Sequence, residues 1–156
     1  MTLRSLATSL VAATLLLSTL ACSKKEDLKP APTPTAGYTL NNRDVKCNAT
    51  GVHTITNNTD LLVVTLTTTP QPTSGPEVFT ITFTKPTSDP IGNYQTVGSS
   101  LTTTTATGPA TTIYGTSAGS VRAGSASDKV SGGFATALAA PPLNAITGGY
   151  FTDIQH

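Results

Sequence analysis

Histidine, cysteine, aspartate and serine are the residue types in this sequence that could do chemistry, and histidine and cysteine are sparse. The sequence has only two histidines, His53 and His156, so we expect no histidine-based metal site, because such sites gather three or four ligands. Calcium needs only carbonyl and carboxylate oxygens, but no Asp-x-Asp-x-Asp-Gly loop is present. Strand alternation makes His53 a surface or cross-strand residue. We therefore predict neither a metal nor a cofactor.

Ser117 lies in Gly115-Thr-Ser-Ala-Gly119, which matches the Gly-x-Ser-x-Gly nucleophile elbow of α/β-hydrolases. That elbow exposes the serine hydroxyl at a sharp turn from a strand into a helix. Here the residues after Gly119 have strand character, and the only candidate bases are His53 and His156. We interpret Ser117 as a turn residue and the protein as no enzyme. A hydrolase that uses Ser117 is a remote alternative.

Cys22 follows a segment with the features of an export signal. Arg4 supplies a positive start, and Leu6 to Leu17 form an uncharged apolar run that is too short to span a bilayer stably. A small residue, Ala21, directly before Cys22 resembles the lipobox of bacterial lipoproteins, although Thr19 stands where that motif usually has leucine. The resemblance implies cleavage before Cys22 and attachment of acyl chains such as palmitate, which would anchor the protein in a lipid bilayer.

A charged stretch comes directly after this cysteine and consists of Ser23, Lys24, Lys25, Glu26 and Asp27. It resembles the short export signal that sends some lipoproteins of Gram-negative bacteria to the outer face of the outer membrane. The resemblance implies a lipid-anchored, surface-exposed protein. The alternative is a solvated spacer that carries no export signal.

The chain divides into a signal peptide, residues 1–21, an acylated N-terminus with a proline-rich linker, residues 22–36, and one domain, residues 37–156. Alternating prolines predict an extended polyproline II linker. The remaining length suits one ordinary domain. That domain carries five basic and six acidic residues, so it offers no basic face to a nucleic acid.

The composition of the domain predicts an all-β fold, because threonine dominates and strong helix formers are scarce. Val52 to Thr56 and Leu61 to Thr67 flank the turn-type cluster Asn57 to Asp60 and predict a hairpin. In the segment Val78 to Thr84, alternation turns three residues toward a core: Phe79, Ile81 and Phe83. Regularly spaced turn signals favour a single antiparallel β-sandwich or small barrel-like domain.

Later segments predict shorter strands at residues 93–97, 111–114, 119–123, 129–138 and 145–154. Gly132-Gly133 predicts a bulge or bend within one of them. Residues 101–110 are compatible with a polar edge strand or with a loop. The Gly–aromatic strands between residues 78 and 154, such as Gly92-Asn-Tyr94 and Thr147-Gly-Gly-Tyr-Phe151, resemble the C-terminal half of small lipoprotein domains of unknown function. That resemblance implies a fold and no activity.

Cys47 is the only cysteine left once Cys22 is acylated, so we expect no internal disulfide. We interpret it as a small buried residue, with a mixed disulfide or redox sensing as alternatives. The expected function is a non-enzymatic binding or structural module of the cell envelope, with a surface protein or glycan as partner. The alternative is an accessory lipoprotein that binds a glycan or small ligand. Without tryptophan, a glycan site would need exposed tyrosines, from Tyr38, Tyr94, Tyr114 and Tyr150.

Overall fold

The structure, a computed structural model of the whole chain, describes residues 33, 35–69, 72, 75–137 and 145–156. The predicted acylation site Cys22 and the charged stretch Ser23 to Asp27 lie outside the described residues. Within them, the one helical element is a short 3-10 turn, η1 (Ile91–Asn93). No helix of the described part is long and apolar enough to cross a membrane.

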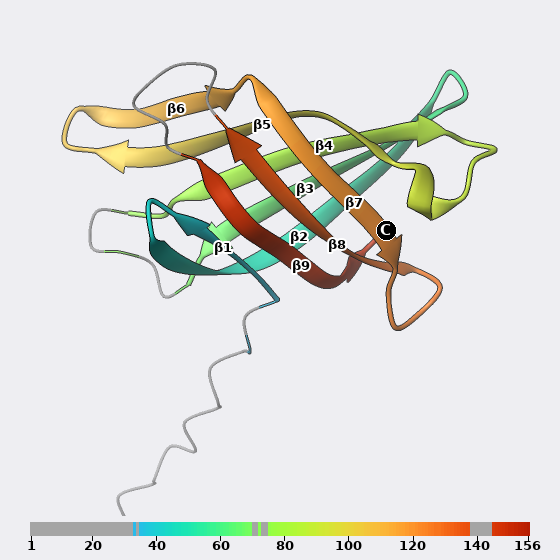
Figure 1. Cartoon of the computed structure of the whole chain (residues 1–156), viewed down its shortest axis with the longest axis horizontal. Helices are drawn as coiled ribbons and strands as arrows, with labels where there is room; N and C mark the ends of the chain where they lie inside the picture. Colours follow the sequence, from blue (N-terminus) through green and yellow to red (C-terminus); the bar gives the residue numbers. More distant parts are fainter. Residues whose placement is uncertain (1–32, 34, 70–71, 73–74, 138–144) are drawn as a thin grey trace, which may run out of the picture. The chain divides into compact units, whose positions relative to one another are not determined.

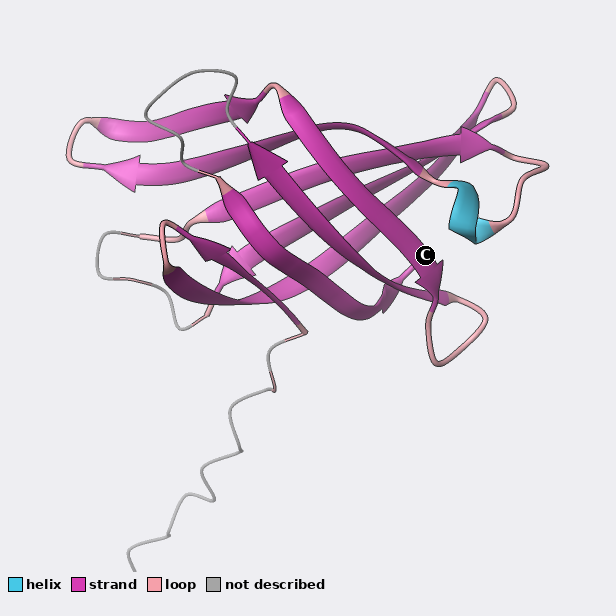
Figure 2. Cartoon of the chain, in the orientation of Figure 1, coloured by secondary structure: helices cyan, strands magenta, loops and turns pink. Residues whose placement is uncertain are grey.

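In the described residues, nine strands form one antiparallel sheet (Figures 1 and 2). They are β1 (Ala36–Leu40), β2 (Arg43–Thr56), β3 (Thr59–Thr68), β4 (Val78–Pro86), β5 (Gln95–Thr105), β6 (Gly108–Tyr114), β7 (Thr116–Ala123), β8 (Lys129–Ala137) and β9 (Ile146–Gln155). Their order is β6-β5-β4-β3-β2-β1-β9-β8-β7. The two edge strands, β6 and β7, do not pair, so the sheet is not closed into a barrel. The all-β prediction is confirmed.

The sheet folds over itself, so that β7, β8 and β9 cross in front of β3, β4 and β5 (Figure 1). Aromatic rings join the two layers. Phe79 of β4 stacks on Phe134 of β8 with ring centroids 4.9 Å apart, and Phe83 lies 6.1 Å from Phe151 of β9. Phe79, Ile81 and Phe83 are fully buried, as their alternation predicted. The core therefore has the layered character of a sandwich.

Two hairpins turn on pairs of asparagines. Asn41 and Asn42 connect β1 to β2, and Asn57 and Asn58 connect β2 to β3, with φ values of 50° and 62° in each pair. Two consecutive positive φ angles are typical of the type I′ turn, which suits the twist of a hairpin and tolerates asparagine. The predicted hairpin around Asn57 is confirmed, and its first strand begins earlier than predicted, at Arg43.

Glycines in β8 and β9 make room for aromatic rings. A Cβ atom at Gly132 would lie 2.4 Å from the Phe151 ring, and one at Gly149 would lie 2.4 Å from the Phe134 ring. The pairing of β8 with β9 also shifts register between Val130 and Gly132, which confirms the predicted irregularity. The Gly–aromatic pattern in the sequence thus reflects close packing between the layers.

The structure specifies two predicted segments more closely. Residues 101–110, compatible with an edge strand or a loop, form the end of β5, a turn and the start of the edge strand β6. The strand predicted at residues 93–97 begins only at Gln95, because Asn93 closes the turn η1 by donating its backbone N–H to the Pro90 carbonyl. This turn positions Tyr94, whose hydroxyl contacts Asp60.

Candidate functional site

The core-facing side chains of β3 and β4 change from apolar to charged at one end of the sheet. Every second residue faces the core, and the last inward positions hold Asp60 in β3 and Lys85 in β4. These two residues are opposite one another in the register, and Lys85 Nζ lies 2.9 Å from Asp60 Oδ2. Their exposed fractions are 4% and 6%, so both charges have lost most of their hydration. Their pairing offsets that desolvation cost.

The second carboxylate oxygen of Asp60 has two further partners. The buried hydroxyl of Tyr94 donates to Asp60 Oδ1 at 2.7 Å, and His53 Nε2 lies 2.6 Å from the same oxygen. His53 reaches it because the Asn57-Asn58 turn sets Ile55 opposite Asp60, which places His53 diagonally across on the same face. The turn residues that set this register are visible in the sequence, so the contact of His53 with Asp60 could have been predicted.

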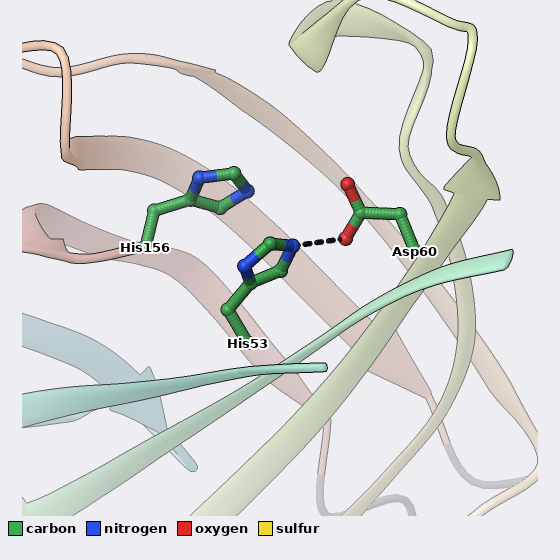
Figure 3. Close-up of side chains that lie close together, drawn as sticks. All are labelled: His53, Asp60 and His156. Atoms are coloured by element: carbon green, nitrogen blue, oxygen red, sulfur yellow. Dashed lines mark hydrogen bonds and ion pairs between the residues drawn. The ribbon is translucent and has the colours of Figure 1, made fainter. Parts of the chain in front are cut away.

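His156 joins the cluster from the far end of the described chain. It comes directly after β9, and its imidazole stacks on that of His53 with ring centroids 4.2 Å apart and planes at 24°. Its Nε2 atom lies 2.9 Å from the Tyr94 hydroxyl. Figure 3 shows both rings beside the Asp60 carboxylate. The five side chains therefore form one connected polar cluster.

Gly51 allows β9 to approach β2 closely enough for this stacking. A Cβ atom at Gly51 would lie 2.3 Å from the backbone oxygen of Gln155, the residue before His156. The backbone N–H of His156 donates to the Asp128 carbonyl at 2.9 Å, which fixes the other side of the strand end. A side chain at position 51 would push this strand end, and with it His156, away from His53.

The electrostatics of the cluster keep Asp60 charged and His156 neutral. Burial alone raises the pKa of Asp60, but hydrogen bonds from Tyr94 and Lys85 and the nearby His53 outweigh it, so the pKa lies below its ordinary value. Burial, together with the neighbouring His53 and Lys85, lowers the pKa of His156. His156 therefore carries an unprotonated ring nitrogen at neutral pH.

This arrangement brings together side chains that can ligate a metal ion. One ligand atom each from His53, Asp60 and His156 lies within 4.8 Å of the others. Imidazole nitrogens and a carboxylate oxygen are ligands that Zn²⁺ and related divalent ions accept. The prediction that no histidine-based site exists relied on the small number of histidines, and the fold brings both of them to one carboxylate.

Ser117 lies inside β7 and not in a turn, which corrects its interpretation as a turn residue. The chain continues after Gly119 as strand β7, with no helix among the described residues that follow, so the segment lacks the geometry of a nucleophile elbow. The Ser117 hydroxyl lies 2.6 Å from the Ser99 hydroxyl of β5. Within the described residues, neither histidine is hydrogen-bonded to Ser117, since their side chains contact Asp60 and Tyr94 instead.

Cys47 is fully buried in β2, and burial raises the pKa of its thiol to about 12. Its interpretation as a small buried residue is confirmed, and a thiol that stays protonated is a poor nucleophile.

The tyrosines do not form the platform that a glycan site was predicted to need. Tyr38, Tyr94 and Tyr114 are buried, and only Tyr150 among the four is exposed, with 46% of its surface accessible. Tyr150 borders a pocket of about 290 Å³ that Lys46 also lines. One exposed ring does not make a pair of coplanar rings, which counts against the glycan alternative.

Comparison of the chain with models of protein families, with curated proteins and with solved structures found no match. The resemblance of the N-terminus to a lipobox and that of residues 78–154 to small lipoprotein domains therefore stay predictions from the sequence.

Proposed function

We propose that this protein is an exported, lipid-anchored module of the envelope of a Gram-negative bacterium, held through Cys22, that binds a partner and does not catalyse a reaction. The order of segments in the sequence supports the anchor: an apolar run, Ala21-Cys22, a charged stretch and a proline-rich linker. Palmitate on Cys22 would hold the domain on the outer face of the outer membrane. Ser23 to Asp27 would be the signal for export to that face.

The observation that carries this proposal is the first contact with the sheet among the described residues. The first residue with described contacts to the sheet is Thr35, whose hydroxyl accepts the Ala49 N–H and whose carbonyl accepts the Thr152 N–H. Cleavage before Cys22 would leave residues 23–34 as a spacer between lipid and domain.

The state of the candidate nucleophiles supports a binding or structural role. Ser117 contacts another serine within the sheet, and the thiol of Cys47 is buried. Neither arrangement supplies an activated nucleophile beside a general base.

The anchor is tested with the full-length chain expressed in a Gram-negative host that is fed labelled palmitate. We expect label on the native protein and its recovery with membranes. Cys22→Ser should lose the label and move to the soluble fraction, because no acyl chain then holds it. Cys47→Ser is the matched control and should keep both. Equal membrane partitioning of the native chain and Cys22→Ser would refute the anchor.

The proposed export signal is tested by replacing Lys24 to Asp27 with alanine. Protease added to intact cells should digest the native domain and spare the variant. Equal digestion of both would show that these residues are only a spacer.

A further inference from the structure

We propose that His53, Asp60 and His156 form a binding site for a divalent transition-metal ion, and that Zn²⁺ is the ion this set of ligands fits best. The site would supply two imidazole nitrogens and one carboxylate oxygen. Three protein ligands leave a fourth position for water or for a group from a partner, which is the pattern of open zinc sites. The proposal does not depend on the lipid anchor.

The distances require only small side-chain movements. In a tetrahedral zinc site with bonds of about 2.0–2.1 Å, the ligand atoms lie about 3.3 Å apart. The three ligand atoms here already lie within 4.8 Å of one another. His53 Nε2 would move outward from its 2.6 Å contact with Asp60, and the His156 ring would move inward. The rings already lie side by side at this carboxylate (Figure 3).

Neighbouring side chains fix the orientation of the Asp60 carboxylate. Lys85 binds Asp60 Oδ2, which leaves Oδ1 directed at the histidines, and the Tyr94 hydroxyl bonds to the same Oδ1. Partners of this kind fix the orientation of metal ligands. The His53 side chain is 26% exposed, whereas that of Asp60 is 6% exposed, so an ion would enter from solvent past His53.

The charge of Lys85 sets the expected strength of binding. Its ammonium group balances the negative charge of the Asp60 carboxylate and repels an incoming cation. We therefore expect weaker binding than at a site whose carboxylate has no cationic partner.

The test is a calorimetric titration of the full-length chain with Zn²⁺, in detergent and without a polyhistidine tag. We expect saturable binding of one ion per chain. His53→Gln and His156→Gln should each lower the affinity about tenfold or more, because even the loss of a residue that only orients a ligand costs 10–100-fold. Asp44→Asn, an exposed carboxylate outside the cluster, is the matched control and should bind like the native chain.

The circular dichroism spectrum of each variant shows whether it is folded, and the two histidine variants give independent readings. Absence of saturable binding by the native chain would overturn the proposal. So would native affinity in either histidine variant, because the site requires both imidazoles. Equal losses in Asp44→Asn and in the histidine variants would show non-specific binding and would also overturn it.

Discussion

Strands β3 and β4 run through two regions that differ in what they bury. In the middle of the sheet their inward residues, such as Val64 and Ile81, are apolar and fully buried in the core. At the end of the same faces, Asp60 and Lys85 bury opposite charges beside two histidines. Apolar burial stabilises a fold directly, whereas a buried ion pair often contributes no more than an apolar pair of equal volume. Stability alone therefore gives little reason to bury Asp60 and Lys85 beside the two histidines at this polar end of the strands.

The largest effect is expected in the aromatic interface. Phe79 stacks on Phe134 and contacts Tyr38 and Tyr114 at the centre of the core. Phe79→Ala should lower the free energy of unfolding by about 3–5 kcal/mol, because it removes buried carbon and leaves a cavity. Urea denaturation measures this change. A loss below about 1 kcal/mol would mean that the two layers do not pack as described.

The buried ion pair should show strong coupling but little net contribution. Asp60→Leu alone leaves the Lys85 ammonium buried without its counter-charge and should cost about 3 kcal/mol. The double variant Asp60→Leu with Lys85→Met should recover most of this loss, because no unpaired charge remains. Urea denaturation of both single variants and the double variant completes the cycle. A double variant as unstable as the worse single variant would show that the fold itself needs the pair.

The approach of β9 to β2 should depend on Gly51. Gly51→Ala places a Cβ against the Gln155 carbonyl and should cost about 1–3 kcal/mol through overpacking. It should also weaken zinc binding, because His156 moves away from His53. Gly98→Ala is the control, since a Cβ there meets nothing within 4 Å. Urea denaturation and zinc titration of both variants test this, and identical behaviour would contradict the role given to Gly51.

A smaller effect is expected from pH. The pKa of His156 is lowered in the folded state, so the unfolded chain binds more protons as pH falls below about 6.5. The free energy of unfolding should therefore decrease between neutral pH and about pH 5. The groups around this imidazole are His53, Asp60, Lys85 and Tyr94. The decrease should be shallower in His156→Gln, and equal slopes in urea denaturation at several pH values would contradict the assignment.

The parts of the fold that depend on local sequence could be predicted. Alternation in Val78 to Thr84 identified a face that is buried, and the turn residues after Thr56 identified a hairpin. The pairing of β1 with β9 could not be predicted, because it joins segments from the two ends of the domain and no local pattern encodes it.

The candidate site divides in the same way. The contact of His53 with Asp60 follows from the register of one hairpin, so the sequence contains enough to predict it. His156 reaches the cluster only because β9 closes onto β1 and crosses near Gly51. Counting histidines did not show that the two residues, which are distant in the sequence, lie side by side in the fold.

The effect of zinc on stability tests most directly whether the polar end is a binding site. A ligand that binds only the folded state at about 100 times its dissociation constant raises the free energy of unfolding by about 2.7 kcal/mol. We predict a rise of this size for the native chain in urea denaturation with Zn²⁺, and none for His53→Gln at the same concentration. An unchanged native chain, or an equal rise in His53→Gln, would contradict the metal site.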